Sequence, residues 1–132
     1  MTQFFRKKEL STLTGLLPET IRYYESKGIL TPPQRATNGY RLFTHKNLQE
    51  LHFIKVCRSL GFSIQEIKQL QDLKNHPQKS CHDADSLVAK HLENVELKIT
   101  QLQEIKQTLL ALKNCSNNQV RQCKVLTYLT EE

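Results

Sequence analysis

The feature that most constrains this chain is a long stretch, from Asp83 to Lys113, that contains neither glycine nor proline. It predicts a single helix of about thirty residues. Its apolar side chains follow the heptad steps of four and three residues, and they are Val88, Leu92, Val95, Ile99, Leu102 and Leu109. A helix with so narrow an apolar stripe needs a partner helix. The same helix of a second chain is the simplest partner, and the helices of this chain are the alternative.

Two short helices with a tight turn between them are predicted at the start of the chain. Residues 6–13 form the first, which Gly15 ends, and residues 18–27 form the second, with Pro18 as its first residue. Two short helices joined by a glycine-containing turn are the helix-turn-helix pattern. Because many helix pairs share this pattern, it does not by itself indicate a function.

A small basic hairpin follows these helices. Two consecutive prolines exclude helix at residues 32–33, and Asn38-Gly39 favours a type I′ turn. The hairpin, which we call the wing, carries Arg35, Tyr40 and Arg41. Such a wing presents arginine and tyrosine side chains to a phosphate backbone.

Two further helices connect the wing to the long helix. The first covers about residues 45–60 and is capped by Thr44. The second runs from about residue 64 to residue 74 and begins with a capping box formed by Ser63 and Glu66. Beyond the long helix, residues 114–123 read as a loop, and the last segment can form one or two helical turns.

The net charge of +6 lies entirely in the N-terminal half of the chain. Residues 1–62 carry ten Lys/Arg and four Asp/Glu, whereas residues 63–132 carry nine of each. A concentrated basic region favours a polyanionic partner, because neutralised phosphates release counterions. An ordinary solvated face is the alternative.

Several classes of protein are excluded by what the sequence lacks. It has no apolar run of about 18 residues and no signal peptide at its start, so we expect a cytoplasmic protein with no membrane partner. Its four glycines form none of the GxGxxG, GxxxxGK or GxSxG signatures. No nucleophile–base pair or carboxylate pair has a recognisable spacing, so we expect no enzyme.

Three of the four cysteines flank the long helix. Cys81 precedes it while Cys115 and Cys123 follow it, and a rise of about 1.5 Å per residue places the two ends about 50 Å apart. In an antiparallel dimer, the start of one helix meets the end of the other. Cys81 of one chain would then approach Cys115 and Cys123 of its partner. Three thiolates suit soft ions such as Cd(II), Pb(II), Hg(II) and Zn(II).

Other interpretations of these residues stay open. His82 or His91 could supply a fourth metal ligand, although each is more simply a surface residue. The thiols could be incidental, or Cys115 and Cys123 could form a redox-sensitive disulfide. Cys57 lies among apolar residues of a helix and is expected to be buried.

In combination, three stretches of this sequence resemble the MerR family of transcriptional regulators. They are TIRYYESKGIL, RATNGYRLFT and LQELHFIKVCRSLGFSIQEIKQL. The resemblance covers essentially the whole chain, and Cys81, the long helix, Cys115 and Cys123 resemble the metal-sensing branch of that family.

The resemblance implies a mainly α-helical homodimer, with a winged helix-turn-helix and a long antiparallel coiled coil. It implies that the dimer binds double-stranded promoter DNA whose elements are too far apart, and that the inducer makes it distort this DNA for RNA polymerase. Residues 1–76 would form the winged helix-turn-helix DNA-binding domain with its connecting helices. Residues 77–132 would form the dimerisation helix and the metal-binding loop.

The resemblance also bears on the metal. The family's ligands correspond to Cys81 of one subunit and to Cys115 and Cys123 of the other, in agreement with the geometric argument. Zinc-responsive members have adjacent cysteines and a histidine in the loop, which residues 115–123 lack. Copper-responsive members need no thiol before the helix, and redox-sensing members carry a four-cysteine cluster. We therefore expect Cd(II) or Pb(II) as inducer and Zn(II) as a weaker one, with a mercury-responsive regulator as the alternative.

For DNA binding, we expect helix 18–27 to enter the major groove and the wing to contact phosphates. The candidate residues are Thr20, Arg22 and Tyr23 on the helix and Arg35, Asn38, Tyr40 and Arg41 on the wing. With so few base-reading side chains, much of the specificity is expected from deformability of the operator. The rival from another class is a thiol-rich helical metal-buffering protein without a DNA function, which would leave the basic wing unused.

Overall fold

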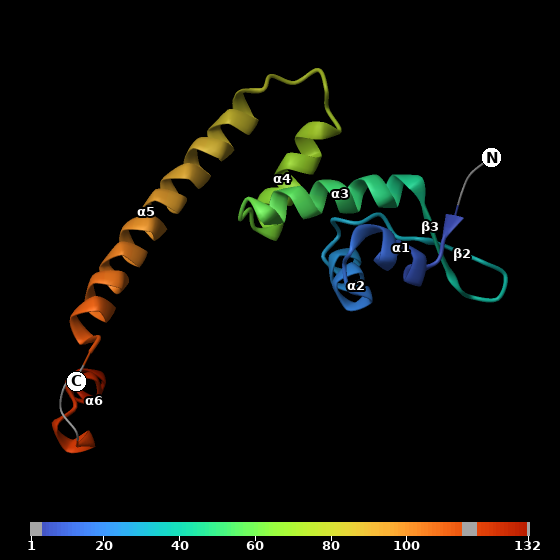
Figure 1. Ribbon diagram of the computed structural model, residues 1–132. Coiled ribbons are helices and arrows are strands. Elements are labelled where there is room, and N and C mark those ends of the chain that lie inside the picture. Colours follow the sequence, from blue (N-terminus) through green and yellow to red (C-terminus); the bar gives the residue numbers. More distant parts are fainter. Residues whose placement is uncertain (1–3, 115–118, 132) are drawn as a thin grey trace. The chain divides into compact units, whose positions relative to one another are not determined.

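The structure is a computed structural model that describes residues 4–114 and 119–131 (Figure 1). Within these ranges the chain is mainly helical, as the sequence predicts, and it has three short strands. The elements are β1 (Phe4–Phe5), α1 (Lys7–Thr14), α2 (Pro18–Ser26), β2 (Gln34–Arg35), β3 (Arg41–Thr44), α3 (His45–Ser59), α4 (Ile64–Lys74), α5 (His82–Leu112), the 3-10 helix η1 (Val120–Gln122) and α6 (Lys124–Thr130). The chain forms two compact units, residues 1–87 and 88–132, and the boundary lies within α5.

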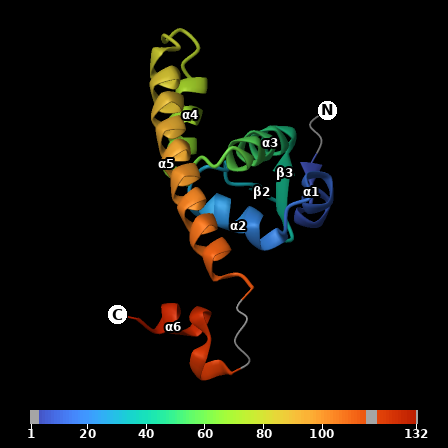
Figure 2. The ribbon, with the colours of Figure 1, turned by 60° about the vertical axis from the view of Figure 1, so that its left-hand side comes forward.

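The first unit packs its helices and its small sheet around one apolar core. Contacts join α1 to α2, α3 and β3, so that these elements lie together (Figure 2). The side chains at the centre of the core are fully buried, and they are Leu10, Ile21, Ile29, Leu30, Phe43, Leu51, Ile54 and Ile67. Cys57 is buried in this core, as expected. The first unit therefore contains the winged helix-turn-helix that the sequence predicts.

The sheet has one strand more than the sequence predicts. Its order is β1-β3-β2, with both pairs antiparallel, and β1 pairs Phe5 with Phe43. On the other side of β3, Arg35 pairs with Arg41. β1 ties the start of the chain to the base of the wing, because β3 is shared by both pairs.

The predicted type I′ turn at Asn38-Gly39 is wrong. That turn requires a positive φ at both central residues, and of these two only Gly39 has one, at 86°. Gly39 N–H donates to Ala36 O at 2.9 Å, and Ala36 N–H donates to Tyr40 O at 2.8 Å. The connection is thus a three-residue loop that ends on a left-handed glycine. Asn38 uses its side chain instead, which accepts a hydrogen bond from Tyr40 N–H at 3.2 Å.

The helices of this unit begin and end at the predicted signals. Thr44 caps α3, and its hydroxyl accepts from Asn47 N–H at 3.3 Å. Ser63 and Glu66 form the predicted capping box of α4, with reciprocal hydrogen bonds of 3.1 and 2.9 Å. Gly15 ends α1 in the left-handed conformation, with φ of 73°. Each of these helices therefore begins and ends within one residue of its predicted bounds.

The predicted long helix is α5, which has 31 residues and buries none of them. It leaves five of the six predicted heptad residues about half exposed or more, namely Val88, Leu92, Ile99, Leu102 and Leu109, while Val95 is half-buried. Among the described residues, most of the apolar stripe is therefore left exposed. No helix in the described part of the chain combines the length and the apolar character that crossing a bilayer requires.

Candidate DNA interface and metal-binding residues

The helix α2 turns two of its three predicted DNA-binding residues outward. Ile21 and Tyr24 are buried in the core, and this period places Arg22 and Tyr23 on the exposed face. Tyr23 is 48% exposed, and Lys27 Nζ lies 5.5 Å from the centre of its ring. Thr20 is half-buried. The exposed face of α2 therefore offers a guanidinium and an aromatic ring to a ligand.

The wing holds its predicted residues in a fixed turn. Arg35 is exposed, and its guanidinium donates to Gly39 O at 3.0 Å. Asn38 is exposed at the tip, and Tyr40 is 58% exposed. These residues lie on the surface, as the sequence predicts for a nucleic-acid contact.

Arg41, the remaining wing residue, is held by a carboxylate. Its Nη1 donates to Glu25 Oε2 at 2.7 Å in an ion pair between β3 and α2. The side chains of Arg41 and Glu25 are 30% and 20% exposed, so the pair is largely shielded from water. The sequence analysis did not include Glu25, because nothing local indicates which distant cation it pairs with.

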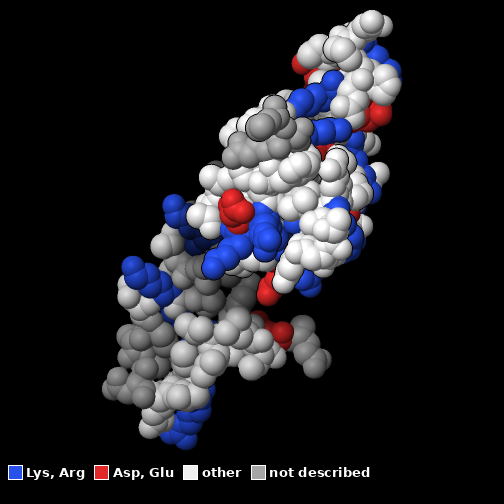
Figure 3. Space-filling model, turned by 90° about the vertical axis from the view of Figure 1, so that its right-hand side faces the viewer, with Lys and Arg blue, Asp and Glu red and all other residues white. Residues whose placement is uncertain are grey.

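Two basic residues of α1 and its N-cap extend the surface beyond the predicted set. The Arg6 guanidinium lies 4.9 Å from the centre of the Tyr40 ring, a cation–π contact with the wing. Partial burial lowers the pKa of Lys7, and the positive charges of Arg22 and Arg41 lower it further. Figure 3 shows Lys and Arg side chains gathered on one face, with acidic side chains beside them. The run of three cations at residues 6–8 is the signal in the sequence that could have found them.

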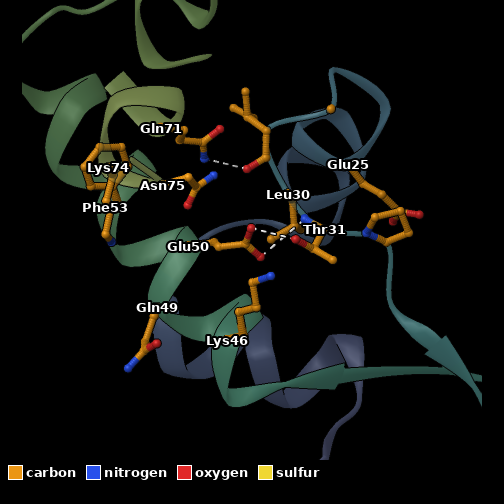
Figure 4. Close-up of a pocket in the computed structure, with 13 residues that line it drawn as sticks. Glu25, Leu30, Thr31, Lys46, Gln49, Glu50, Phe53, Gln71, Lys74 and Asn75 are labelled. Carbon is orange, nitrogen blue, oxygen red and sulfur yellow. Dashed lines mark hydrogen bonds between the residues drawn. The ribbon is translucent and has the colours of Figure 1, made fainter. Parts of the chain in front are cut away.

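The connection that leads into the wing is anchored to α3 and α4. Glu50 accepts from Thr31 N–H at 3.3 Å and from its hydroxyl at 2.7 Å, and Gln71 Nε2 donates to Ile29 O at 2.7 Å. These contacts border a pocket of about 480 Å³ between the connection, α3 and α4 (Figure 4). Asn47 Nδ2 also donates to Thr31 O, at 2.8 Å. The wing is thereby tied to both helices that follow it.

The predicted metal-binding thiols differ in exposure. Cys81 is exposed directly before α5, and its carbonyl accepts from Asp85 N–H at 2.9 Å, which places it at the N-cap. Cys123 is half-buried between η1 and α6. Cys115 lies outside the described residues. Among the residues that are described, no three His, Cys, Asp or Glu side chains converge as ligands.

The remaining cysteine and the two candidate histidines occupy other surroundings. Burial raises the pKa of the Cys57 thiol, an effect that the nearby Lys74 partly offsets. Cys57 and Cys81 nevertheless line the same pocket of about 340 Å³, formed by α3, α4 and the segment before α5. His82 is exposed, and its backbone N–H donates to Ser80 Oγ at 3.1 Å. His91 is half-buried on α5.

Comparison with known proteins decides the family. The chain matches the family described as "MerR HTH family regulatory protein" over residues 5–74, and the family described as "MerR, DNA binding" over residues 48–112. The chain belongs to the MerR family. The two matches overlap, and together they run from β1 to the end of α5.

Individual MerR relatives are similar over nearly the whole chain. The HTH-type transcriptional regulator CueR of Escherichia coli O6:H1 is 35% identical over 123 residues, which are 92% of this chain and 91% of CueR. The mercuric resistance operon regulatory protein of Bacillus cereus is 33% identical over 130 residues, 97% of this chain and 98% of that protein. The crystal structure of PbrR691 from Ralstonia metallidurans CH34 in complex with lead(II) is 32% identical, with a TM-score of 0.80 over 95% of this chain and 98% of that one.

These relatives are regulators of transcription, and the predicted regulator of MerR type is confirmed. This MerR-family chain is a metal-responsive, DNA-binding transcriptional regulator and not an enzyme.

Proposed function

We propose that this MerR-family regulator senses Cd(II) or Pb(II) through three thiolates shared between two subunits. The ligands are Cys81 of one subunit and Cys115 and Cys123 of the other. The observation that carries the proposal is an exposed thiol at the start of a 31-residue helix, with a second described thiol beyond its end. A helix of this length is about 45 Å long, so one chain cannot bring both thiols to one ion. Two chains can do so when their α5 helices run antiparallel.

The apolar stripe of α5 supports the second subunit. Leu102, Ile105 and Leu109 form part of a shallow apolar groove on the helix surface, and each is at least half exposed in the single chain. Burying a leucine or isoleucine side chain contributes about 1.5–3 kcal/mol. A stripe of such residues therefore favours pairing of α5 with a second copy of itself.

The chemistry of the ligands favours a soft metal. Thiolates are soft ligands, and they favour soft ions such as Cd(II), Pb(II) and Hg(II). The relative PbrR691, crystallised in complex with lead(II), supports this choice. The mercuric resistance regulator favours Hg(II) as the second candidate. Zn(II) prefers four ligands, which His82 or His91 would have to complete.

The residues of the first unit supply the DNA contacts in this proposal. Arg22 and Tyr23 on the exposed face of α2 enter the major groove, and the wing with Arg35 and Tyr40 lies along the flanking phosphates. Cys81 precedes α5 and lines a pocket together with residues of α3 and α4, so ligation there bears on the DNA-binding unit. Ligation shifts the dimer toward the conformation that binds the metal better, which in this proposal distorts promoter DNA for RNA polymerase.

A mixed dimer tests the shared site directly. Cys81→Ser in one subunit and Cys115→Ser with Cys123→Ser in the other leave one complete site if ligands come from both subunits, and none if each chain binds metal alone. We expect the mixed dimer, purified with two different affinity tags, to bind one equivalent of Pb(II) with the absorption of lead–thiolate bonds. Each parental homodimer should bind none tightly.

In vitro transcription from the promoter that the protein binds then ranks the ions. Induction should be strongest with Cd(II) or Pb(II), and the mixed dimer should retain part of it, while both parental homodimers bind DNA without induction. Cys57→Ala is the matched control and should respond as the wild type does. A mixed dimer without a lead site, or a wild type that responds to Hg(II) alone, would contradict the proposal. Induction of transcription by the metal under strong reductant would exclude a disulfide switch.

A further inference from the structure

An acidic residue lies in the middle of the basic surface that faces DNA in the proposed function. Glu25 is the penultimate residue of α2, and its carboxylate accepts a 2.7 Å charge-assisted hydrogen bond from Arg41 on β3. Pairs that are partly shielded from water are held more strongly than exposed ones, whose contribution is small. Glu25 and Arg41 therefore connect the end of α2 to the base of the wing.

Other cations converge on the same place. Burial lowers the pKa of Lys7 on α1, the charges of Arg22 and Arg41 lower it further, and those of Glu25 and, more weakly, Glu19 raise it. A carboxylate among three cations reduces their mutual repulsion. At the same time it weakens attraction for phosphates, since each negative charge on the binding surface opposes the DNA. Because Glu25 lowers the affinity for DNA, we expect it to contribute to another property of DNA binding.

The contribution lies in the geometry of the two DNA-reading elements. α2 and the wing contact successive parts of a duplex, and their separation must match the groove and its flanking backbone. Arg41 belongs to β3 and faces Arg35 across the hairpin, so fixing Arg41 fixes the whole wing. The base of the wing is also anchored by the pairing of β1 with β3, by the buried Phe43 and by the connection that Glu50 holds, whereas the ion pair joins the wing directly to α2.

We propose that Glu25 is a positioning residue that holds the wing against α2 through Arg41 and thereby sets the sequence specificity of DNA binding. Arg41 is committed to Glu25, in place of the phosphate contact expected from the sequence alone. The inference rests on the proposed DNA contacts of α2 and the wing, and it assigns to an acid a role that the basic surface would not suggest.

The test compares affinity for two duplexes over a range of salt. One is selected from random-sequence DNA on the wild-type protein, and the other is a shuffled duplex of the same composition. Glu25→Gln frees Arg41, so the slope of log K against log salt for the shuffled duplex should steepen by about one ion. The preference for the selected duplex should fall about tenfold, the cost of a misplaced base contact. Arg41→Gln should lose the same preference without flattening the slope.

Two further variants separate positioning from charge and from folding. Glu19→Gln removes a carboxylate from the first turn of the same helix and should raise affinity for both duplexes alike, with the preference unchanged. The exchange of the pair, Glu25→Arg with Arg41→Glu, should restore most of the preference, which a merely destabilised protein would not regain. Thermal unfolding of each variant confirms that the folded protein is being measured.

The outcomes distinguish this inference from the proposed function. If the wild type selects no sequence, the proposed DNA contacts fail. If it selects one but Glu25→Gln keeps the preference, or Arg41→Gln flattens the salt slope by about one ion, then Arg41 is a phosphate contact and the positioning role is wrong.

Discussion

Asn47 is the buried polar residue at the junction of the wing and α3, and its replacement by aspartate isolates the role of the amide. Asn47 is 2% exposed. Its Nδ2 donates to Thr31 O at 2.8 Å and to Glu50 Oε1 at 3.3 Å, while its Oδ1 accepts from Thr44 N–H at 2.8 Å. Asn47→Asp keeps the shape and the acceptor for Thr44. It removes both donors and adds a carboxylate beside Glu50.

The expected loss is about 3 kcal/mol of unfolding free energy. The Thr31 carbonyl loses its Asn47 donor, which costs about 1–3 kcal/mol where the group is shielded from water. The new carboxylate is desolvated next to the like charge of Glu50, and this adds a cost of similar size. Together these terms lower the melting temperature by about 10 °C or more.

Urea unfolding followed by far-ultraviolet circular dichroism measures this loss. Variants are compared at one protein concentration, because subunit association raises apparent stability. Gln65→Glu makes the same amide-to-carboxylate change at an exposed position of α4 and should stay within about 0.5 kcal/mol of the wild type. If Asn47→Asp also lies within about 1 kcal/mol of the wild type, the amide does not support the junction as the hydrogen bonds indicate.

Iodoacetamide should label Cys57 far more slowly than Cys81, because burial raises the pKa of the Cys57 thiol and protects it; equal rates by mass spectrometry would contradict this. The same shift makes the free energy of unfolding fall as pH rises above the ordinary thiol pKa, since the unfolded thiol ionises first, and Cys57→Ala should lack that decline. Leu102→Lys places a charge on the stripe of α5 and should give a monomer in sedimentation experiments; an intact dimer would place the interface elsewhere. Gln71→Leu breaks the bond between α4 and the Ile29 carbonyl, and it should reduce metal-dependent transcription several-fold while metal and DNA affinities stay near wild type. Full induction in that variant would exclude this bond from the coupling.

The helices could be predicted from the sequence because their signals are local. The hydroxyl and carboxylate of the Ser63–Glu66 capping box are three residues apart, and Gly15 ends α1 directly after its last turn. β1 could not be predicted, because two residues show no alternation, and its partner β3 is remote in the sequence. The type I′ prediction failed because Asn38-Gly39 is compatible with a two-residue and a three-residue loop. The hydrogen bonds of Ala36 decide between them.

The same distinction between local and long-range signals applies to the candidate DNA interface. The outward positions of Arg22 and Tyr23 follow from the helical period, because the same period places Ile21 and Tyr24 on the face of α2 that is buried in the core. The pairing of Glu25 with Arg41 does not follow, because the two residues are separated by 16 positions and only the fold brings them together. A candidate list built from residue type therefore includes Arg41 as a phosphate contact and omits the acid that holds it.

A shared pocket and a chain of hydrogen bonds lead from Cys81, a metal ligand in the proposed function, toward the wing. Cys81 and Leu70 of α4 line one pocket, and the next residue of α4, Gln71, donates to the Ile29 carbonyl in the connection to the wing. Two residues further along, Thr31 is held by Glu50. A continuous path of contacts does not by itself couple metal binding to DNA binding. Coupling requires an element that has two arrangements and whose equilibrium is shifted by both sites. α4 shares a pocket with Cys81 and donates a hydrogen bond to the connection that carries the wing. If Cys81 binds metal as proposed, α4 is therefore the element through which we expect ligation to reach the wing.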